Sequence, residues 1–389
     1  MSFIIFYLIN GNLIILTTLM YFHLFNKERN LNLIIIFIAL LIIKIVFISI
    51  KEKINNYFFF IKKKMISTIL ILLMIFFWTK KIIQFYIFFE IISLVIFSLI
   101  FFSRFSNQRL KARIYIFMFI GIRTFPILVI FFFLNEKTII FIFIIGFSIK
   151  LPIMFFHLWL PKAHVEANFY DSIILASLLL KLGGYGLIVL NLNKKMNFIF
   201  IWGLIRILFL SINIIFLIDL KIVFAYSSII HINGIILILV RNNFSTEKIF
   251  IIIIISHAIS SSLIFYIIGL IYEFSFSRSI FINKNFILNN IVFFIILFLT
   301  IFINIAIPPL ITFFSEIYIY ISLLNYRKKI FFFLSCIMFL SIIFNLIVLK
   351  NLGISNLNKF FKINQIKIKN LILVKEHLTI VILIYWNSL

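Results

Sequence analysis

Six ionisable side chains lie inside long apolar stretches of the sequence. They are two glutamates, two lysines and two histidines, namely Glu90, Lys150, Lys181, His231, His257 and Glu316. In a bilayer a charge at the centre of a helix costs about 2.5–3.5 kcal/mol even on a lenient scale, so such residues usually face protein or water and mark an ion path. Because carboxylates, amines and imidazoles can all bind and release a proton, this set suggests proton transfer.

Helical spacing strengthens this interpretation. Residues three or four apart share one helix face, and most of the six have polar or small neighbours at that spacing: Tyr86 and Ser93, Ser177 and Tyr185, Ser227 and Gly234, Ser260 and Ser261, Thr312 and Tyr320. A stripe of this kind can hold water or a side chain from another helix, but it cannot face lipid. Each group could instead be a structural contact between helices. For six groups on six runs we favour a conduction path.

Lys150 carries a second signal, because Pro152 follows it by two residues. Proline removes a backbone donor and disfavours helical geometry in the residue before it, which predicts a broken helix near Lys150–Pro152 or, alternatively, a plain kink. Gly183 and Gly184 form a similar weak point after Lys181. Desolvation disfavours a buried ammonium and a nearby carboxylate favours it. A lysine that gains and loses such a partner can therefore carry a proton.

The elements that position these residues follow from composition. Of 389 residues, 65% are hydrophobic and only 12% are charged, whereas a soluble domain has about 25% charged residues. Since about 20 apolar residues span a bilayer as a helix, the runs predict an all-α polytopic membrane protein with 13 or 14 transmembrane helices. The count depends on whether Pro308-Pro309 breaks one helix or separates two. The runs are 3–25, 31–50, 65–79, 82–102, 112–134, 138–158, 171–191, 197–218, 222–240, 248–271, 285–307, 309–326, 329–349 and 371–388.

We expect a single transmembrane domain over 1–389, with a core at 82–326 that carries the proton path. Residues 350–389 would form a basic connection and a C-terminal helix. The formal net charge is +25, but the basic residues lie between apolar runs and form no single stripe, so we expect no nucleic-acid partner. Lys44 and Arg206 could extend to the membrane interface, and the more central Arg123 has no assigned role.

Motifs for redox or nucleotide chemistry are absent from the sequence. Cys336 is the only cysteine, which excludes cysteine-ligated iron–sulfur clusters. No pair of histidines is placed for haem, and no Walker loop is present. We therefore expect neither a cofactor-binding site nor a metal site in this chain.

One block carries a specific resemblance. His157-Leu-Trp-Leu-Pro-Lys-Ala-His-Val-Glu-Ala167 is preceded by Lys150-Leu-Pro152 and followed by Leu178-Leu-Leu-Lys-Leu-Gly-Gly-Tyr-Gly-Leu187. This block resembles the chain 4 family of mitochondrial NADH dehydrogenase (ubiquinone), the antiporter-like, proton-pumping subunits of respiratory complex I. Weaker matches extend it over about 85–320, at Phe88-Phe-Glu90, Asp219-Leu-Lys221, Ala225 to His231, Ser256 to Ser261, Tyr272-Glu273, Ser277-Arg278 and Pro308 to Glu316.

The resemblance implies a role for each residue. Glu90 resembles a mid-membrane glutamate that pairs with Lys150, and Lys181 resembles the central lysine. His231 and His257 resemble connecting histidines, and Glu316 resembles the acidic residue on the exit side. The family holds these groups in a chain of charges and water, and protons cross when NADH reduces ubiquinone in other subunits. NADH, FMN, iron–sulfur clusters and ubiquinone would be bound by partner subunits, so this chain would be part of an enzyme without a redox site of its own.

The implied setting is the mitochondrial inner membrane, crossed many times. The implied partners are other membrane-arm subunits, including neighbouring antiporter-like subunits, and lipids such as cardiolipin. The sequence departs from the family at Asn168, where proline is usual, and at Leu217-Ile218, where Arg-Gln is usual. Two alternatives stay open. One is a cation/proton antiporter subunit of a related multi-subunit complex, and the other is a passive scaffold whose polar stripes only join helices.

Overall fold

The computed structural model describes residues 57–79, 81–101, 157–189, 197–239, 244–284, 291–308, 310–324 and 328–353, with isolated residues between 110 and 152. In this part the chain is almost wholly helical, and its one β-bridge joins Asp219 to Ser279. The helices are α4 (Tyr57–Trp78), α5 (Ile82–Phe101), α9 (Trp159–Glu166), α10 (Phe169–Ile174), α11 (Leu180–Val189), α12 (Asn197–Ile214), α13 (Leu220–Leu239), α14 (Phe244–Ser275), α15 (Ile291–Ile305), α16 (Ile311–Leu324) and α17 (Lys328–Gly353), with π-helical turns η1 (Phe117–Gly121) and η2 (Leu175–Leu179).

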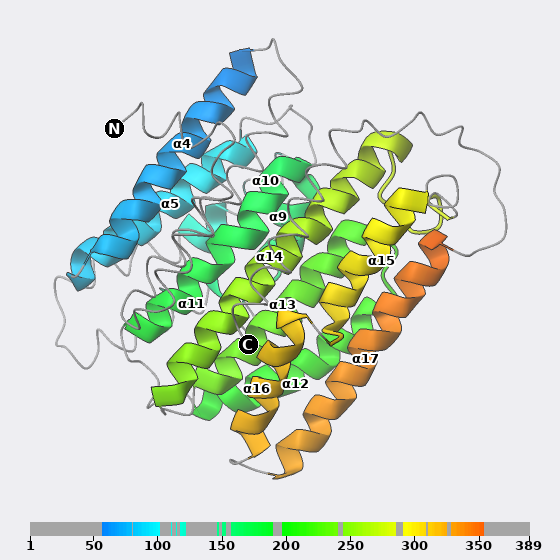
Figure 1. Ribbon diagram of the computed structural model, residues 1–389. Helices are drawn as coiled ribbons and strands as arrows, with labels where there is room; N and C mark the ends of the chain where they lie inside the picture. Colours follow the sequence, from blue (N-terminus) through cyan, green and yellow to red (C-terminus); the bar gives the residue numbers. More distant parts are fainter. Residues whose placement is uncertain are drawn as a thin grey trace.

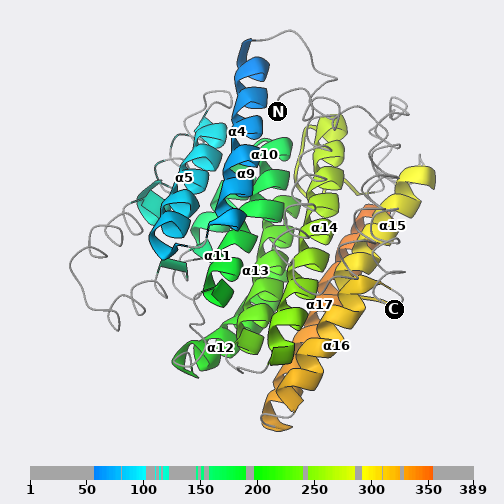
Figure 2. The same ribbon diagram turned by 60° about the vertical axis from the view of Figure 1, so that its left-hand side comes forward.

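The long helices lie side by side as a bundle (Figures 1 and 2). The 32-residue helix α14 is central, since it contacts α10, η2 and α11 on one side and α13, α15 and α16 on others. The hairpin of α4 and α5 lies at one end of the bundle, and α15, α16 and α17 lie at the other. The helix that carries His257 is thereby placed between the elements that carry Lys181 and Glu316.

Both predicted helix breaks are present. Lys150 is helical, Leu151 and Pro152 form a turn, and α9 begins only at Trp159. Further along, α15 ends at Ile305, Ala306 takes a left-handed φ of 61°, and α16 begins at Ile311. Pro308 lies in this second break, and Pro309 lies outside the described residues. Two separate helices therefore flank the prolines, because a proline disfavours helical geometry in the residue before it.

An irregular turn that the sequence did not predict precedes Lys181. Residues Leu175–Leu179 form η2, a π-helical turn between α10 and α11. The expected weak point at Gly183-Gly184 lies instead inside regular α11. These glycines permit close packing: a Cβ on Gly184 would lie 2.8 Å from the ring of Phe250. The distortion of the helix therefore lies about one turn before the glycines, where the glycine content of the sequence does not reveal it.

The number of crossings stays a prediction. Among the described residues, Ile252–Ser275 and Ser335–Gly353 are long and apolar enough to span a bilayer, and Ile83–Leu99, Gly203–Ile214 and Phe294–Ile305 are shorter apolar helices. The expected runs at 3–25, 31–50 and 371–388, together with Lys44 and Arg123, lie outside the described residues. The expected basic connection and C-terminal helix over 350–389 stay a prediction, because residues 354–389 lie outside the described part of the chain. Helix α17 continues to Gly353. The exposed Lys350 lies in its last turn, where the helix dipole favours a cation.

Candidate proton-transfer site

The first predicted pair forms in full. Helix α5 presents Glu90 to Lys150, and Lys150 Nζ lies 3.1 Å from Glu90 Oε1. The ammonium also donates to the Phe89 carbonyl at 2.9 Å and lies 3.3 Å from the centre of the Phe89 ring. Both residues are buried, with 2% and 1% of their surface exposed. The helix break after Lys150 thus places an ammonium among a carboxylate, a carbonyl and an aromatic face, all of which favour its charge.

Lys181 is compensated differently. It is buried, and its ammonium donates to the Ala176 carbonyl and, at 3.4 Å, to Ser261 Oγ on α14. Ala176 belongs to η2, and a π-helical turn disturbs the regular backbone ladder so that a carbonyl can accept from a side chain. Among the described residues no carboxylate is paired with Lys181.

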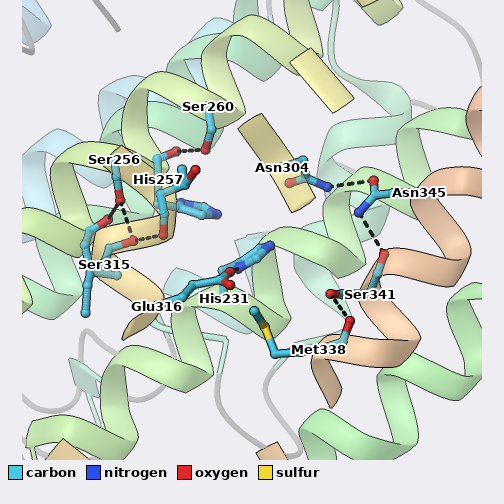
Figure 3. Close-up of polar contacts among 12 residues, drawn as sticks. His231, Ser256, His257, Ser260, Asn304, Ser315, Glu316, Met338, Ser341 and Asn345 are labelled. Carbon is cyan, nitrogen blue, oxygen red and sulfur yellow. Dashed lines mark hydrogen bonds and ion pairs between the residues drawn. The ribbon is translucent and has the colours of Figure 1, made fainter. Parts of the chain in front are cut away.

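The two histidines and the second glutamate converge from three helices (Figure 3). His257 lies on α14, one turn before Ser261, and its ring centre is 5.8 Å from that of His231 on α13. His231 Nδ1 in turn lies 3.5 Å from Glu316 Oε1 on α16. This arrangement joins a carboxyl group to an imidazole directly and brings a second imidazole within reach of one bridging water.

This second cluster lines a cavity that has about 70 Å³ accessible to water. Since one water needs about 10–15 Å³ on such a measure, the cavity can hold several. Three residues of its lining each carry a buried polar atom that has no hydrogen-bond partner among the described residues: His257 Nδ1, Thr312 Oγ1 and Glu316 Oε2. Buried polar atoms are rarely left unsatisfied, so the cavity is suited to water that bonds to these groups.

The predicted residues therefore fall into two clusters with Lys181 between them. A smaller cavity, of about 10 Å³, lies beside Lys181 and is lined otherwise by apolar groups including Leu151, Phe250 and Ile254. It has room for about one water. Leu151 is the residue after Lys150, so this narrow apolar space separates the first cluster from the central lysine.

Several buried polar residues were not singled out from the sequence. His164 is fully buried and stacks on Phe265 with ring centres 4.3 Å apart, and neither ring nitrogen has a partner among the described residues. Lys62 Nζ pairs with Asp171 Oδ2 at 3.0 Å. The only signal for His164 in the sequence was its place in the block that carries the resemblance. Lys62 gave none, because its run of lysines is typical of a solvated end.

Arg206 departs from expectation. From the sequence, Arg206 could extend to the membrane interface, but it lies near the middle of α12 and is buried, with 6% of its surface exposed. The guanidinium therefore lies against protein, and its Nε has no hydrogen-bond partner among the described residues.

The weaker motifs meet at one end of α9. Lys221 Nζ donates to the Ala167 carbonyl at 2.7 Å, and Arg278 donates to the Val165 carbonyl at 2.5 Å. Arg278 Nε also lies 3.6 Å from Asp219 Oδ2. Cations at the carboxyl end of a helix satisfy its last carbonyls and complement its dipole. These contacts, from Lys221 in the first turn of α13 and from Arg278 just after α14, therefore fix α9, and with it His164, against α13 and α14.

Comparison with known proteins assigns the chain to a family. The family model described as "NADH:quinone oxidoreductase/Mrp antiporter, TM" matches residues 133–344, more than half of the chain. The chain belongs to this family. NADH-ubiquinone oxidoreductase chain 4 of Artemia franciscana is 32% identical over 263 residues, covering 63% of this chain and 68% of the relative. Chain 4 of Apis mellifera ligustica is 30% identical over 350 residues, covering 80% and 73%.

Within the family, these relatives identify an antiporter-like membrane subunit of the complex I chain 4 type. Against chain 4 of Locusta migratoria, which is 32% identical, the match spans about half of the relative, 52% of its length. Solved structures share the fold. A chain of respiratory complex I from Thermus thermophilus with bound NADH gives a TM-score of 0.78 at 14% identity, covering 91% of this chain and 80% of that one. A chain of an archaeal membrane-bound sulfane sulfur reductase gives 0.77, also at 14% identity.

The family assignment confirms the resemblance and the all-helical, multi-pass membrane fold that the sequence predicts. It does not test the individual site residues. Their roles rest on the contacts described above.

Proposed function

We propose that the chain translocates protons across the mitochondrial inner membrane as a subunit of complex I. Electron transfer from NADH to ubiquinone in other subunits would drive it. The observation that supports this most directly is that titratable groups from separate helices meet in pairs: the buried Glu90 and Lys150 at 3.1 Å, and the partly buried His231 and Glu316 at 3.5 Å. A passive scaffold needs neither paired titratable groups nor a cavity beside them.

The proposed steps follow from the two clusters. At one end, Glu90 holds the ammonium of Lys150, and a change in their separation would make Lys150 release or rebind a proton, because the carboxylate favours the charged lysine. At the other end, a proton on Glu316 can pass to His231 directly and to His257 through water. Lys181 lies between them and donates to Ser261, on the same helix as His257.

The electron-transfer chemistry would lie elsewhere. We propose that NADH, FMN, iron–sulfur clusters and ubiquinone bind to partner subunits, and that this chain joins neighbouring antiporter-like subunits in the membrane arm with lipids such as cardiolipin around it. The names of the relatives favour complex I over the related cation/proton antiporters, since all of those described above are chain 4 proteins.

Lys181→Ala tests the proposal. In the assembled complex reconstituted in vesicles, we expect this variant to lose proton pumping while NADH oxidation by the peripheral arm stays nearly unchanged, because the carrier is removed without touching the redox groups. The measurement is the number of protons moved per NADH oxidised. The control is Lys64→Ala, which removes an exposed lysine on α4. An unchanged ratio in Lys181→Ala would show that Lys181 carries no proton.

A further inference from the structure

One wall of the cavity carries an amide side chain, which a second amide behind it holds in place. Asn304 on α15 lines the cavity, and its Nδ2 donates to Asn345 Oδ1 on α17 at 2.9 Å. Asn345 Nδ2 then donates to the Ser341 carbonyl at 2.9 Å, and Ser341 lines the cavity too. Figure 3 shows this chain of bonds across from His231 and Glu316. The polar lining thus continues beyond Glu316 onto a helix that carries no titratable group of the site.

These amides are deeply placed for polar groups. Asn304 and Asn345 expose 6% and 0% of their surfaces, and the residues around them on α15 and α17 are mostly apolar. A buried amide is tolerated only when it is hydrogen-bonded. Packing alone could be achieved by leucines of similar size, so the amides point to a role that needs polarity.

The position of Asn304 along the chain connects it to Glu316. Two residues after Asn304, Ala306 takes its left-handed φ of 61° and the chain leaves α15. Helix α16 then begins at Ile311 and carries Thr312 and Glu316 into the same cavity. The hydrogen bond from Asn304 to Asn345 therefore holds the last turn of α15 against α17. The helix break that directs Glu316 toward the cavity follows immediately.

We propose that Asn304 and Asn345 are positioning residues for proton transfer at Glu316. Asn304 helps to hold the water that solvates Glu316 Oε2, an atom without a hydrogen-bond partner among the described residues, and the bond from Asn304 to Asn345 anchors the helix break against α17. The inference rests on the proposed function and adds to it a water-holding wall on α15 and α17. Neither residue need gain or lose a proton itself.

Two double variants separate this role from packing. If the amides hold water, the polar variant should pump better than the apolar one; if they only fill space, the variant that keeps the volume should pump better. The double variant Asn304→Leu/Asn345→Leu keeps the volume and removes both bonding partners together, so it leaves no unpaired amide. The double variant Asn304→Ser/Asn345→Ser keeps polarity but loses volume. We expect the leucine pair to assemble and its pumping rate at saturating NADH to fall roughly tenfold, because an apolar wall cannot replace the bonds of displaced water. The serine pair should keep most of its pumping.

The control is Thr300→Val on α15, one turn before Asn304. Thr300 is buried with 3% exposure and bonds only locally, to the Leu297 carbonyl, and it does not line the cavity. We expect it to pump normally. The proposal is overturned if the leucine pair pumps like the control, or if the serine pair assembles without pumping. The result for the serine pair decides the matter even if the leucine pair fails to assemble. If Lys181→Ala pumps normally as well as the leucine pair, the proposed function itself fails. If Lys181→Ala fails to pump while the leucine pair pumps normally, only the role of the amides is overturned.

Discussion

At the scale of single residues, the buried charges are stabilised in unlike ways. Lys150 has a carboxylate, a carbonyl and a ring, whereas Lys181 has a carbonyl and a hydroxyl. A charge that loses its only ionic partner in a low-dielectric interior is destabilising by about 3–5 kcal/mol. The Glu90–Lys150 pair should therefore respond strongly to removal of one member and weakly to removal of both.

This gives a prediction on stability. Glu90→Gln leaves the Lys150 ammonium buried without its carboxylate, and we expect it to lower the free energy of unfolding by about 3–5 kcal/mol. Adding Lys150→Met removes the orphaned charge and should recover most of that loss. The measurement is the midpoint of heat inactivation of the assembled complex. Equal midpoints for the single and double variants would contradict an ionic contact.

The positions of the site residues could be predicted from the sequence, but many of their partners could not. Hydropathy alone marks Glu90 and Glu316, since an acid within an apolar run is conspicuous. It cannot reveal that Lys150 bonds to the Phe89 carbonyl, because a backbone acceptor has no signature in residue type. Asn304 and Asn345 escaped notice for a related reason: asparagine is frequent in this chain, so two buried copies do not stand out.

At the scale of helices, proline predicted both breaks and hydropathy predicted most of the described helices. The π-helical turn η2 was not predictable, because its hydrogen-bond spacing leaves the apolar pattern unchanged. The glycines are informative in another way, because they mark places where two helices approach each other closely. A Cβ on Gly269 of α14 would lie 2.6 Å from the Phe169 ring of α10 and 2.7 Å from Phe169 Cβ, so turning the ring cannot relieve the clash.

A matched pair of glycines tests this contact. We expect Gly269→Ala to separate α10 from α14 and to lower the free energy of unfolding by about 1–3 kcal/mol, as overpacking does. In Gly234→Ala the new methyl would lie 3.9 Å from Ile319, an ordinary contact. Both changes replace a helical glycine, so each gains the same intrinsic helix propensity of about 1 kcal/mol. Heat inactivation midpoints that move together in the two variants would exclude steric contact as the cause.

At the scale of the whole molecule, two ion pairs among the described residues join the hairpin of α4 and α5 to the rest of the bundle. Glu90 of α5 pairs with Lys150, and Lys62 of α4 pairs with Asp171 of α10. Lys62 and Asp171 expose 7% and 2% of their surfaces. Because α10 leads through η2 to Lys181, this second pair fixes the hairpin that carries Glu90 relative to the central lysine.

Charge reversal tests the joint between hairpin and bundle. We expect Lys62→Asp and Asp171→Lys each to prevent stable assembly, since each places like charges together in a buried contact. The combined variant should restore assembly in part. Native electrophoresis of the membrane complex reports this outcome. Lys64→Asp, at an exposed position two residues away, should assemble normally because exposed charges contribute less than about 1 kcal/mol. Failure of the combined variant to improve on the single ones would show that the pair is not the joint.

The Lys62–Asp171 contact also has a consequence for biosynthesis. The two residues are 109 positions apart, and a ribosome adds about 5–20 residues per second. The early hairpin must therefore wait roughly 5–20 s for its counter-ion after Lys62 has been made. During that interval Lys62 lacks the counter-ion that Asp171 later supplies, and an ammonium on a nascent helix is costly to release into lipid. We expect the insertion machinery to retain α4 and α5 until α10 has emerged, so that these helices enter the membrane as a group.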